Sequence, residues 1–441
     1  MSRFLFALLG VLWLDPASAQ TPVFVPQGSF SAITYNVAGL PQGLSSGNPA
    51  VNTAPIGVRL NNYDLVNVQE DFNYDNVLRA NLTLPFSSPF SGTAGTGDGL
   101  NTFSRFPLND FIRVKWNKSF GLFCCGNDQL TPKGLSHVRV TLSRGIYLDL
   151  YNLHADADVD PGSEAARADN LRQLAAYILA QSAGNAVIVM GDTNARYTRI
   201  ADIMQEFVAT AGLTDVWVQL ARGGSAPVQN DISLIDATNL SGPNNEVVDK
   251  ILYRSSRAVQ LTPVSYTVDN RIFIDATGTP LSDHFPVISQ FNYALASDVR
   301  YSDIFGGSGG DAYNDLVVVP APTTSIRQIT VRGAARIDRV SFVYDNGARV
   351  SHGGIGGSDR TITLAAGEYP IGARLCTGLH NTLRIFYLAI TTSLGQSVAN
   401  GVPTNTCATL TAPSGSKITG FLGRSGDELD QMGLIARPIN P

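Results

Sequence analysis

Five short polar motifs, each next to an apolar run, carry most of the chemistry that this sequence could perform. They are Tyr35-Asn36-Val37, Val68-Gln69-Glu70, Asn152-Leu153-His154, Gly191-Asp192-Thr193-Asn194 and Ser282-Asp283-His284-Phe285-Pro286. Carboxylate and amide oxygens are the hard ligands that Mg²⁺ prefers, and histidines and carboxylates are the acid–base groups that phosphoester cleavage needs. The set therefore indicates a metal-dependent phosphoesterase site.

The first two motifs supply candidate metal ligands. Glu70 ends a run with the pattern of a buried strand, so its carboxylate is expected at the rim of a site rather than in the core. With Asn36 on another strand it could hold one Mg²⁺, which is usually bound by one or two carboxylates and keeps several waters. Asp283 is expected to face the metal, and Mn²⁺ or Co²⁺ could replace Mg²⁺. The alternative for Glu70 is a solvated residue at a strand end.

His284 is the best candidate for a general base, because an unperturbed pKa of about 6.5 would let it accept a proton from water at neutral pH. Such a base needs a carboxylate to fix its tautomer, and Asp249 in the strand-like run 247–252 is suited to that role. Taken alone, an Asp-His pair is more often ordinary surface chemistry. The four companion motifs decide against that interpretation.

His154 closes an alternating run and is expected to donate a hydrogen bond to a non-bridging phosphate oxygen. Asp192 and Asn194 lie two residues apart just past a buried strand, so both side chains face the same side if the extended geometry persists. The carboxylate could orient water or the leaving group, and the amide could bind phosphate. An isolated loop of this type is common, so the motif has weight only with the others.

Strand-like runs alternate with amphipathic helical stretches between residues 29 and 294, and each motif lies at a strand end. The continuously apolar run 186–190 predicts a strand buried on both faces. Before it, apolar residues recur at helical spacing over 171–179, with Ser163 near the start and Gly184 as the stop. This order predicts a layered α/β sandwich. Further strands are expected at residues 32–37, 65–69, 137–142, 147–153 and 287–291.

The composition changes after Asn292. Residues 294–302 are expected to form a linker with few contacts, and no convincing long helix follows. Short alternating runs and the turn signal Asp345-Asn346-Gly347 indicate β-hairpins. Residues 303–441 are therefore expected to form an independent all-β domain, and a length of 441 residues agrees with two domains.

The N-terminus has the pattern of a secretory signal. A basic start at Arg3, a short apolar core and the small residues 17–19 indicate cleavage after Ala19, so the mature protein is expected to be extracellular. No later run reaches about 18 continuous apolar residues, so no transmembrane segment is expected. The net charge of −5 gives no overall attraction to nucleic acid. Glycosylation sequons, which would be used in a eukaryotic host, stand at Asn81, Asn117 and Asn239.

The four cysteines fall into two groups, which suits an oxidising compartment. Cys376 and Cys407 are expected to form one disulfide that closes a loop of roughly 30 residues and stabilises the fold by about 3 kcal/mol on the chain-entropy model. Cys124 and Cys125 are adjacent. A vicinal disulfide and two separate fates both stay open for them.

In their order along the chain, the motifs resemble those of the endonuclease/exonuclease/phosphatase superfamily, whose fold is a four-layer α/β sandwich. Two details resemble its secreted neutral sphingomyelinase branch rather than deoxyribonuclease I. One is His154-Ala155-Asp156-Ala157, and the other is Cys125-Gly126-Asn127-Asp128 followed by Lys133-Gly134. The resemblance covers residues 29–293.

This resemblance assigns Mg²⁺ to Glu70 and Asn36, the general base to His284, phosphate binding to His154 and Asn194, and the attacking water or leaving group to Asp192. Many members of the branch carry an exposed aromatic hairpin that enters lipid. Here residues 254–282 offer Tyr266, Ile272 and Phe273, which strand packing explains at least as well. The resemblance therefore leaves the headgroup open, because an inositol phosphosphingolipid would be hydrolysed by the same chemistry as sphingomyelin.

The C-terminal residues carry a second resemblance, to jacalin-related lectins, which form a β-prism of three Greek-key sheets. It rests on the glycine clusters 306–310 and 353–354, on Gly367-Glu368-Tyr369 and on the segment 420–430. Lectins of this family bind sugar through a Gly-x-x-x-Asp loop and a glycine-rich loop, where backbone amides approach the ring and an Asp accepts hydroxyl hydrogen bonds. The residues implied here are Gly309, Gly310, Gly426, Asp427, Glu428 and Asp430. A prism that no longer binds sugar is the alternative.

Together the resemblances predict a secreted, Mg²⁺-dependent phospholipase C that acts on a sphingophospholipid at a membrane surface, with a lectin domain directed to cell-surface or cell-wall glycans. A deoxyribonuclease-like endonuclease on the same fold is an alternative, since fold does not determine substrate. The acidic composition argues against it, because duplex binding draws heavily on Lys and Arg. A lectin with a vestigial catalytic domain is a second alternative, which the intact acid, base and metal positions disfavour.

Overall fold

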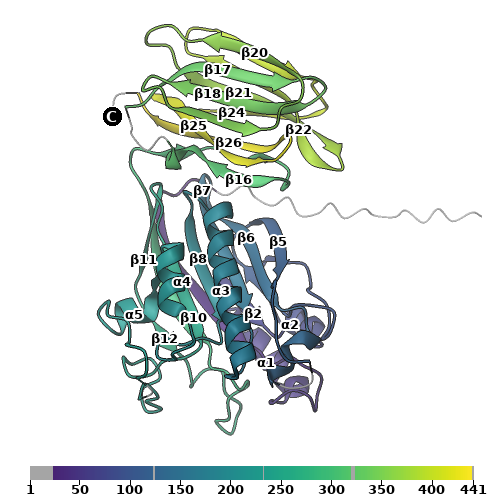
Figure 1. Ribbon diagram of the computed structural model, residues 1–441, viewed down its shortest axis with the longest axis vertical. Helices are drawn as coiled ribbons and strands as arrows, with labels where there is room; N and C mark the ends of the chain where they lie inside the picture. The colour runs from purple at the N-terminus through teal and green to yellow at the C-terminus, as the bar shows by residue number, and fades with distance from the viewer. Residues whose placement is uncertain (1–22, 123–124, 232, 319–322, 440–441) are drawn as a thin grey trace, which may run out of the picture.

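The computed structural model describes residues 23–122, 125–231, 233–318 and 323–439, and it contains two domains stacked along its longest axis (Figure 1). The predicted signal peptide, Cys124 and the side chain of Cys125 lie outside the described residues. None of the helices in the described part of the chain combines the length and apolar character that spanning a bilayer requires.

Two sheets face each other in the N-terminal domain. The strands of the first are β1 (Gln27–Asn36), β2 (Leu65–Gln69), β3 (Phe86–Ser87), β4 (Asn101–Ser104), β11 (Val259–Pro263), β12 (Thr267–Val268) and β13 (Val287–Leu295). Those of the second are β5 (Leu108–Lys115), β6 (Gly134–Ser143), β7 (Ile146–His154), β8 (Ala186–Asp192), β9 (Thr214–Asp215) and β10 (Asp249–Arg254). The strand orders are β11-β13-β1-β2-β4-β3, with β12 beside β13, and β5-β6-β7-β8-β10-β9.

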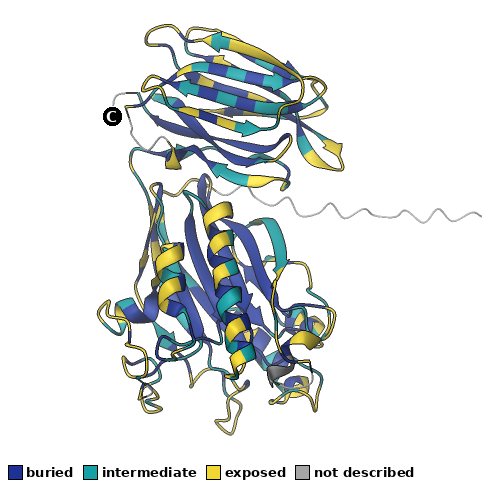
Figure 2. Ribbon diagram, viewed as in Figure 1, coloured by how far each residue is buried: buried dark blue, intermediate teal, exposed yellow. Residues whose placement is uncertain are grey.

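Helices cover the outer face of each sheet. On the first sheet, Leu60 of α1 (Pro49–Leu60) and Leu78 of α2 (Asp75–Ala80) belong to one buried cluster with Val66 of β2. On the second, α3 (Pro161–Gln181) and α4 (Met204–Ala211) do the same, and α5 (Val216–Leu220) follows β9. The central strands β7 and β8 are buried along their whole length, while the outward faces of α3 and α4 are exposed (Figure 2). The predicted four-layer α/β sandwich is confirmed.

The long helix α3 begins at Pro161. The carboxylate of Asp160 caps it by accepting hydrogen bonds from the backbone N–H groups of Gly162 and Ser163. Ser163 lies in the first turn, near the start of the helix as predicted, but it is not the capping residue. The helix ends at Gln181, and Gly184 follows with a φ of 76°, the left-handed conformation that suits glycine.

The C-terminal domain is an antiparallel prism of three sheets. The first contains β14 (Arg300–Tyr301), β15 (Phe305–Gly306), β16 (Asp311–Asn314), β25 (Ser416–Ser425) and β26 (Leu429–Pro438). The second contains β17 (Ile326–Gly333), β18 (Ile337–Tyr344), β19 (Arg349–Gly353) and β20 (Ser358–Thr363), and the third β21 (Pro370–His380), β22 (Thr382–Thr392), β23 (Ser397–Gly401) and β24 (Thr406–Thr411). The predicted jacalin-like prism is confirmed. So is the disulfide, since Cys376 of β21 and Cys407 of β24 are bonded.

The segment between the domains is not a contact-poor linker. Strand β13 continues to Leu295, and Arg300 and Tyr301 already pair with β26 of the prism. Val299, Leu316 and Ile435 belong to one buried apolar cluster with the side chains that fill the space between the two N-terminal sheets. The two domains therefore share one hydrophobic core at their junction.

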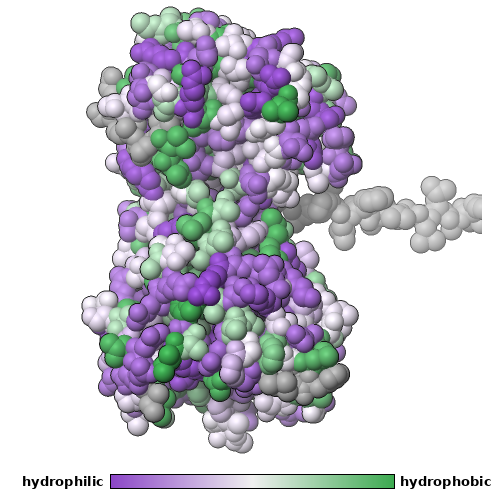
Figure 3. Space-filling view, in the orientation of Figure 1, coloured by the Kyte–Doolittle hydropathy of each residue, from purple (hydrophilic) through white to green (hydrophobic). Residues whose placement is uncertain are grey.

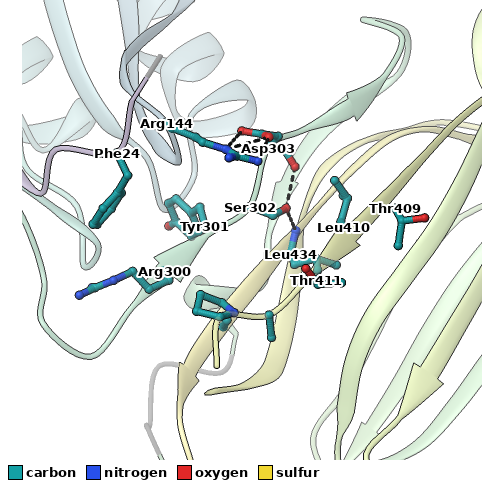
Figure 4. Close-up of a pocket in the computed structure, with 13 residues that line it drawn as sticks. Phe24, Arg144, Arg300, Tyr301, Ser302, Asp303, Thr409, Leu410, Thr411 and Leu434 are labelled. Atoms are coloured by element: carbon teal, nitrogen blue, oxygen red, sulfur yellow. Dashed lines mark hydrogen bonds and ion pairs between the residues drawn. The ribbon is translucent and has the colours of Figure 1, made fainter. Parts of the chain in front are cut away.

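Polar contacts and a small cavity complete the junction. Gln181 at the end of α3 donates to Asp311 at 2.9 Å, and Gln431 of β26 donates to Asp110 at 3.1 Å. Figure 4 shows the cavity of about 330 Å³ on another side of the junction, where Arg144 pairs with Asp303 at 2.7 Å. Apolar residues also gather at the waist between the domains on the face shown in Figure 3.

Candidate active site

The sequence motifs meet at the end of the sandwich that lies away from the prism (Figure 1). Strands β1 and β2 are parallel, with Asn36 opposite Gln69, and β7 and β8 are parallel, with His154 opposite Asp192. Strand β10 runs antiparallel to β8 and begins at Asp249, directly opposite Asp192. Because the carboxyl ends of parallel strands lie at one edge, the register itself brings four motifs together.

Asp192 lies at the centre of this group. Its Oδ2 accepts a hydrogen bond from Nδ2 of Asn36 at 3.2 Å, and the same amide donates to Oε1 of Glu70 at 3.1 Å. Oδ1 of Asp192 accepts from the backbone N–H of Asn194 at 2.9 Å. Burial alone would raise the pKa of Asp192, but His284 and His154 outweigh it and lower that pKa. Asp192 is thus held as a buried carboxylate.

Glu70 reaches the site through a strained backbone. Its φ of 56° is left-handed, which costs an L-residue about 1–2 kcal/mol and turns the chain at the end of β2. Its backbone carbonyl accepts hydrogen bonds from Gly39 and Phe72, which stabilise this conformation. Burial raises the pKa of Glu70, and Lys133 and the amide of Asn36 oppose that shift. A non-glycine residue in this conformation is consistent with a functional constraint.

His284 is bonded to one carboxylate and faces a second. Its Nδ1 lies 2.7 Å from Oδ2 of Asp249, and its Nε2 lies 3.7 Å from Oδ2 of Asp192. The carboxylate predicted to orient this histidine is therefore in contact with it. Burial alone would lower the pKa of His284, but Asp249 and Asp192 outweigh it and raise the pKa to about 11. In the protein without a bound cation, the two carboxylates therefore favour the protonated imidazole of His284.

The pKa of His154 is shifted in the opposite direction to that of His284. Burial and the nearby charge of Lys133 lower its pKa to about 3, so the ring is neutral at physiological pH. Its Nε2 lies 3.5 Å from Oδ2 of Asp192, and its buried Nδ1 has no hydrogen-bond partner among the described residues. A neutral imidazole can donate one N–H and accept at the other nitrogen.

Asn194 does not follow the extended geometry expected from its spacing. Strand β8 ends at Asp192, and Asn194 has a φ of 49°, so its side chain and that of Asp192 are not alternate residues of one strand. Its Nδ2 donates instead to the backbone carbonyl of Ala155 at 3.0 Å. The two motifs after β7 and β8 are joined by this bond.

Asp283 lies at the outer rim of the site. It is exposed, and its carboxylate accepts hydrogen bonds from the hydroxyls of Ser46 and Ser282. The Ser282 hydroxyl also donates to the backbone carbonyl of Asn36 at 2.7 Å. Phe273, considered as a lipid-contacting residue, is buried, with its ring centroid 5.0 Å from that of Tyr35, whereas Ile272 is 49% exposed.

Two motif residues, Gln69 and Asn152, form buried hydrogen bonds between the two sheets. Gln69 donates to the side-chain carbonyl of Asn152 at 2.7 Å, and Asn152 donates to the backbone carbonyl of Val68 at 3.0 Å. Asn67 donates to the backbone carbonyls of Tyr151 and Met190. These buried amides hold the two sheets in one relative position and so align Glu70 with Asp192.

Sequence reasoning missed Lys133 as a site residue. Its ammonium pairs with Asp128 in the 3₁₀ helix Cys125–Leu130 and lies 3.5 Å from the carbonyl of Ala155. Asp128 in turn accepts from the backbone N–H of Ala157 at 2.6 Å. The segments 125–134 and 154–157, which both resemble the sphingomyelinase branch, are therefore in contact. The presence of both segments in one sequence was the signal that could have indicated Lys133 as a site residue.

The donor chemistry of the site fits a divalent cation. Glu70 and Asp192 accept hydrogen bonds from the same amide of Asn36. Burial raises the pKa values of Glu70 and Asp249, and the charges of Asp283 and Asp192 respectively add to these shifts. Asp192, Asp249 and His284 also have ligand atoms within 4.8 Å of one another. Since Nδ1 of His284 is bonded to Asp249, the Glu70–Asn36 side offers the oxygen donors that Mg²⁺ prefers.

The predicted carbohydrate site lies in the first sheet of the prism. A methyl group built on Gly309 would lie 2.6 Å from Oδ1 of Asp430, so the glycine loop leaves no room for a side chain beside that carboxylate. Oδ1 of Asp430 has no hydrogen-bond partner within the described ranges. Glu428 points elsewhere, because it pairs with Arg336 at 2.6 Å and Arg384 at 3.1 Å. Gly426 and Asp427 are exposed beside the loop.

Comparison with known families agrees with this geometry. A model described as the endonuclease/exonuclease/phosphatase family matches residues 33–284, more than half of the chain. The chain belongs to this family. A second model, the jacalin-like lectin domain, matches residues 302–435. Both resemblances predicted from the motifs are confirmed.

Individual relatives fall into the same two groups. Sphingomyelinase of Mycobacterium tuberculosis is 38% identical over 282 residues, which are 62% of this chain and 54% of the relative, so the chain spans about half the length of that protein. Horcolin of Hordeum vulgare is 33% identical over 141 residues, covering 30% of this chain and 94% of the relative. A crystal structure of β toxin from Staphylococcus aureus with bound magnesium ions is 15% identical, covers 59% of this chain and 99% of that one, and has a TM-score of 0.41.

Proposed function

We propose that this protein is a secreted, Mg²⁺-dependent phosphodiesterase that hydrolyses a sphingophospholipid, and that its prism binds carbohydrate. The observation that carries the proposal is the convergence of Glu70, Asn36 and the His284–Asp249 pair on Asp192. The 38% identity to a protein named sphingomyelinase supports this substrate class. The signal-like pattern of residues 1–19 supports secretion.

The reaction forms one bond to phosphorus and breaks another. A water oxygen attacks the phosphorus, a proton of that water passes to Nε2 of His284, and the bond from phosphorus to the ceramide oxygen breaks. Asp249 holds the imidazole through Nδ1, and so aims Nε2 into the site. The ceramide oxygen takes up a proton as it leaves, and the phosphorylated headgroup keeps the oxygen of the water.

Charge builds on the phosphoryl oxygens during this step. Neutral His154 can donate to one of them, and a divalent cation held by Glu70 and Asn36 would neutralise part of the charge. Without a cation, the surrounding carboxylates keep His284 protonated at neutral pH, with a pKa of about 11. Positive charge near Glu70 would favour the neutral imidazole, which is the form that accepts a proton.

Parallel assays test the proposal directly. The purified full-length protein is incubated with sphingomyelin, inositol phosphoceramide and plasmid DNA, with Mg²⁺ or with EDTA, and the His284→Ala variant serves as the matched control. We expect release of a phosphorylated headgroup only with Mg²⁺ and only from the wild type. DNA nicking without lipid hydrolysis would instead identify a nuclease, which the formal charge of −5 disfavours.

Carbohydrate binding is tested separately from hydrolysis. The Asp430→Asn variant removes the charge of the carboxylate in the first-sheet loop with almost no change in shape. Glycan-array binding should fall sharply in this variant, while hydrolysis of detergent-dispersed lipid should stay at the wild-type level. Equal binding by both proteins would refute the proposed sugar site.

A further inference from the structure

A second cavity lies at the domain junction, separate from the one in Figure 4. It has a volume of about 310 Å³, and we call it the junction cavity. Its polar side chains come from both domains and include Asn109 and Asp110 of β5, Arg139 of β6, Asp303, and Gln431 of β26. Of the described residues that line it, none belongs to the catalytic motifs and none is Asp430. The junction cavity is therefore distinct from both proposed sites.

Asp110 reaches the junction cavity from a strained position in β5. Its φ of 54° is left-handed, a conformation that is unfavourable for a residue with a side chain. The pairing of β5 with β6 is irregular between Asn109 and Ile112, so Asp110 lies in a bulge. There Nε2 of Gln431 donates to both of its carboxylate oxygens, at 3.1 and 3.2 Å. Since one amide nitrogen is shared between the two oxygens, the carboxylate can accept further hydrogen bonds.

Two buried polar side chains of the lining have unused hydrogen-bonding atoms. Oε1 of Gln431 is buried and has no hydrogen-bond partner among the described residues. Arg139 is only 4% exposed and donates to Asp149 through Nε at 2.9 Å. In the described part of the chain, its two Nη atoms have no hydrogen-bond acceptor. Because buried polar groups are normally paired, these atoms provide an acceptor and a donor for a molecule in the junction cavity.

The charges at the junction cavity disfavour ions as ligands. Asp303 is already in an ion pair and Arg139 is paired with Asp149, so an anion would find no unpaired positive charge among the described lining residues. A metal ion at Asp110 would lie beside the N–H groups of Gln431 and Arg139, which a cation repels. A neutral molecule with several hydroxyls fits better, because each hydroxyl can both donate and accept a hydrogen bond.

We propose that the junction cavity binds one neutral cyclic polyol, of the size of a pyranose or a cyclitol. Asp110 and Oε1 of Gln431 accept hydrogen bonds from its hydroxyls, and the Nη atoms of Arg139 donate to its oxygens. Tyr147 and Ile304 form an apolar part of the wall, against which a ring can pack. The volume is at the lower end of the range of about 300–1,000 Å³ for ligand pockets, so the cavity accommodates a single ring rather than an oligosaccharide.

The bound ring would bridge the two domains. Asp110 and Arg139 belong to the sandwich and Gln431 to the prism, so a ligand that contacts all three is bound only while the junction is intact. A molecule that binds the folded state alone raises the melting temperature once its concentration exceeds the dissociation constant. This effect requires neither lipid hydrolysis nor sugar binding at Asp430, so the inference is independent of the proposed function.

Binding to the full-length protein is measured by calorimetry and by melting temperature. The probes are methyl α-glucopyranoside and myo-inositol, with galacturonate and glucosamine as an anionic and a cationic ring of similar size. We expect a neutral ring to bind, and Asp110→Asn to weaken that binding by at least about tenfold, since hydrogen bonds to a charged acceptor are the stronger kind. Asp430→Asn should leave this binding unchanged, which separates it from sugar bound at the prism loop.

The Asp110→Gly variant distinguishes a ligand site from a structural contact. Glycine adopts a φ of 54° without strain, so the ligand-free variant should melt close to the wild-type temperature although the hydrogen bond to Gln431 is lost. Binding of the neutral ring should nevertheless be abolished. Asp311→Asn is the matched control, because Asp311 accepts from Gln181 at 2.9 Å elsewhere in the junction, and this variant should bind the ring normally.

The dependence on Asp110 decides between the outcomes. Binding of either neutral ring that is lost in Asp110→Gly and kept in Asp311→Asn and Asp430→Asn supports the inference and identifies which ring the junction cavity prefers. No binding of a neutral ring, or equal affinity in the wild type and Asp110→Asn, would overturn the site. Binding of galacturonate or glucosamine in place of the neutral rings would overturn the proposed class of ligand.

Discussion

The two ends of this molecule build their sites from different materials. At the free end of the sandwich, side chains from both sheets converge on Asp192, and Glu70 and Asn194 adopt left-handed backbone conformations there. At the prism end, the left-handed positions are glycines, such as Gly310, and a single carboxylate faces backbone. The site in the sandwich therefore depends on charged side chains held in place by a strained backbone. The site in the prism depends on the shape of a glycine-rich loop.

The largest loss of stability should come from removing the prism. Truncation after Ser297 would remove Val299, Leu316, Leu422 and Ile435 from the shared cluster, and each fully buried side chain of this kind contributes about 1.5–3 kcal/mol. The loss is comparable to the whole stability of a typical domain, about 5–15 kcal/mol. We expect the truncated protein to be unfolded or much less stable by thermal denaturation.

A milder change controls for this truncation. Gln431→Ala removes one contact to Asp110 and should lower the melting temperature only slightly. If the truncated protein is folded and hydrolyses detergent-dispersed lipid at the wild-type rate, the two ends are independent units and the shared core has little energetic weight.

Loss of the proposed base should affect one end only. His284→Ala should reduce kcat by about 10²- to 10⁴-fold, the usual contribution of a general base, with glycan binding unchanged. His380→Ala, which changes a half-exposed histidine of the prism, is the matched control. A His284 variant that keeps the acidic limb of the wild-type pH–rate profile would remove this residue from the role.

Loss of charge at Glu70 should give a different signature. Glu70→Gln keeps the shape but weakens the attraction to a cation, so activity should fall by roughly 10²–10³-fold and recover in part at high Mg²⁺. Titration of Mg²⁺ against activity measures this shift. Wild-type activity at low Mg²⁺ would show that Glu70 is not a metal ligand.

The sequence predicted the positions of strand ends better than the geometry beyond them. The continuously apolar run 186–190 identifies β8, because a strand buried on both faces needs apolar residues throughout. Shorter or alternating apolar runs identify β1, β2 and β7, and the polar motifs lie where these runs end. The left-handed turn at Asn194 was not predictable, because its cause is the hydrogen bond to Ala155, a residue remote in sequence. The same limit applies to Lys133, whose role depends on tertiary contacts.

Pattern reading also failed at the domain junction. Residues 294–302 have the composition of a linker, yet Arg300 and Tyr301 pair with β26 and Val299 is fully buried. Whether a short segment packs depends on the surfaces on either side of it, here Tyr147 and Ile435, and no local pattern reports on those.

The two active-site histidines should titrate in opposite directions in the metal-free protein. From an ordinary value of 6.5, the pKa of His284 is raised to about 11 and that of His154 is lowered to about 3. His284 thus stabilises the fold below pH 6.5, an effect lost as the pH rises toward 11, whereas the contribution of His154 is present above pH 6.5 and lost as the pH falls toward 3. Imidazole proton signals in EDTA, followed by NMR against pH, measure both. Titration of both rings near pH 6.5 would contradict the geometry.

The smallest effect is expected at Asp283, which was predicted to face the metal. Its carboxylate is exposed and bonded to two serine hydroxyls, so its charge acts through solvent and is strongly screened. We expect Asp283→Asn to reduce kcat/KM by less than about tenfold, since an exposed charge pair is worth only about 0–1 kcal/mol. Ser46→Ala, which removes one of its hydrogen bonds, is the matched control. A loss of kcat/KM as large as that of Glu70→Gln, with the same dependence on Mg²⁺, would show that Asp283 contacts the cation directly. The metal site would then reach the exposed rim.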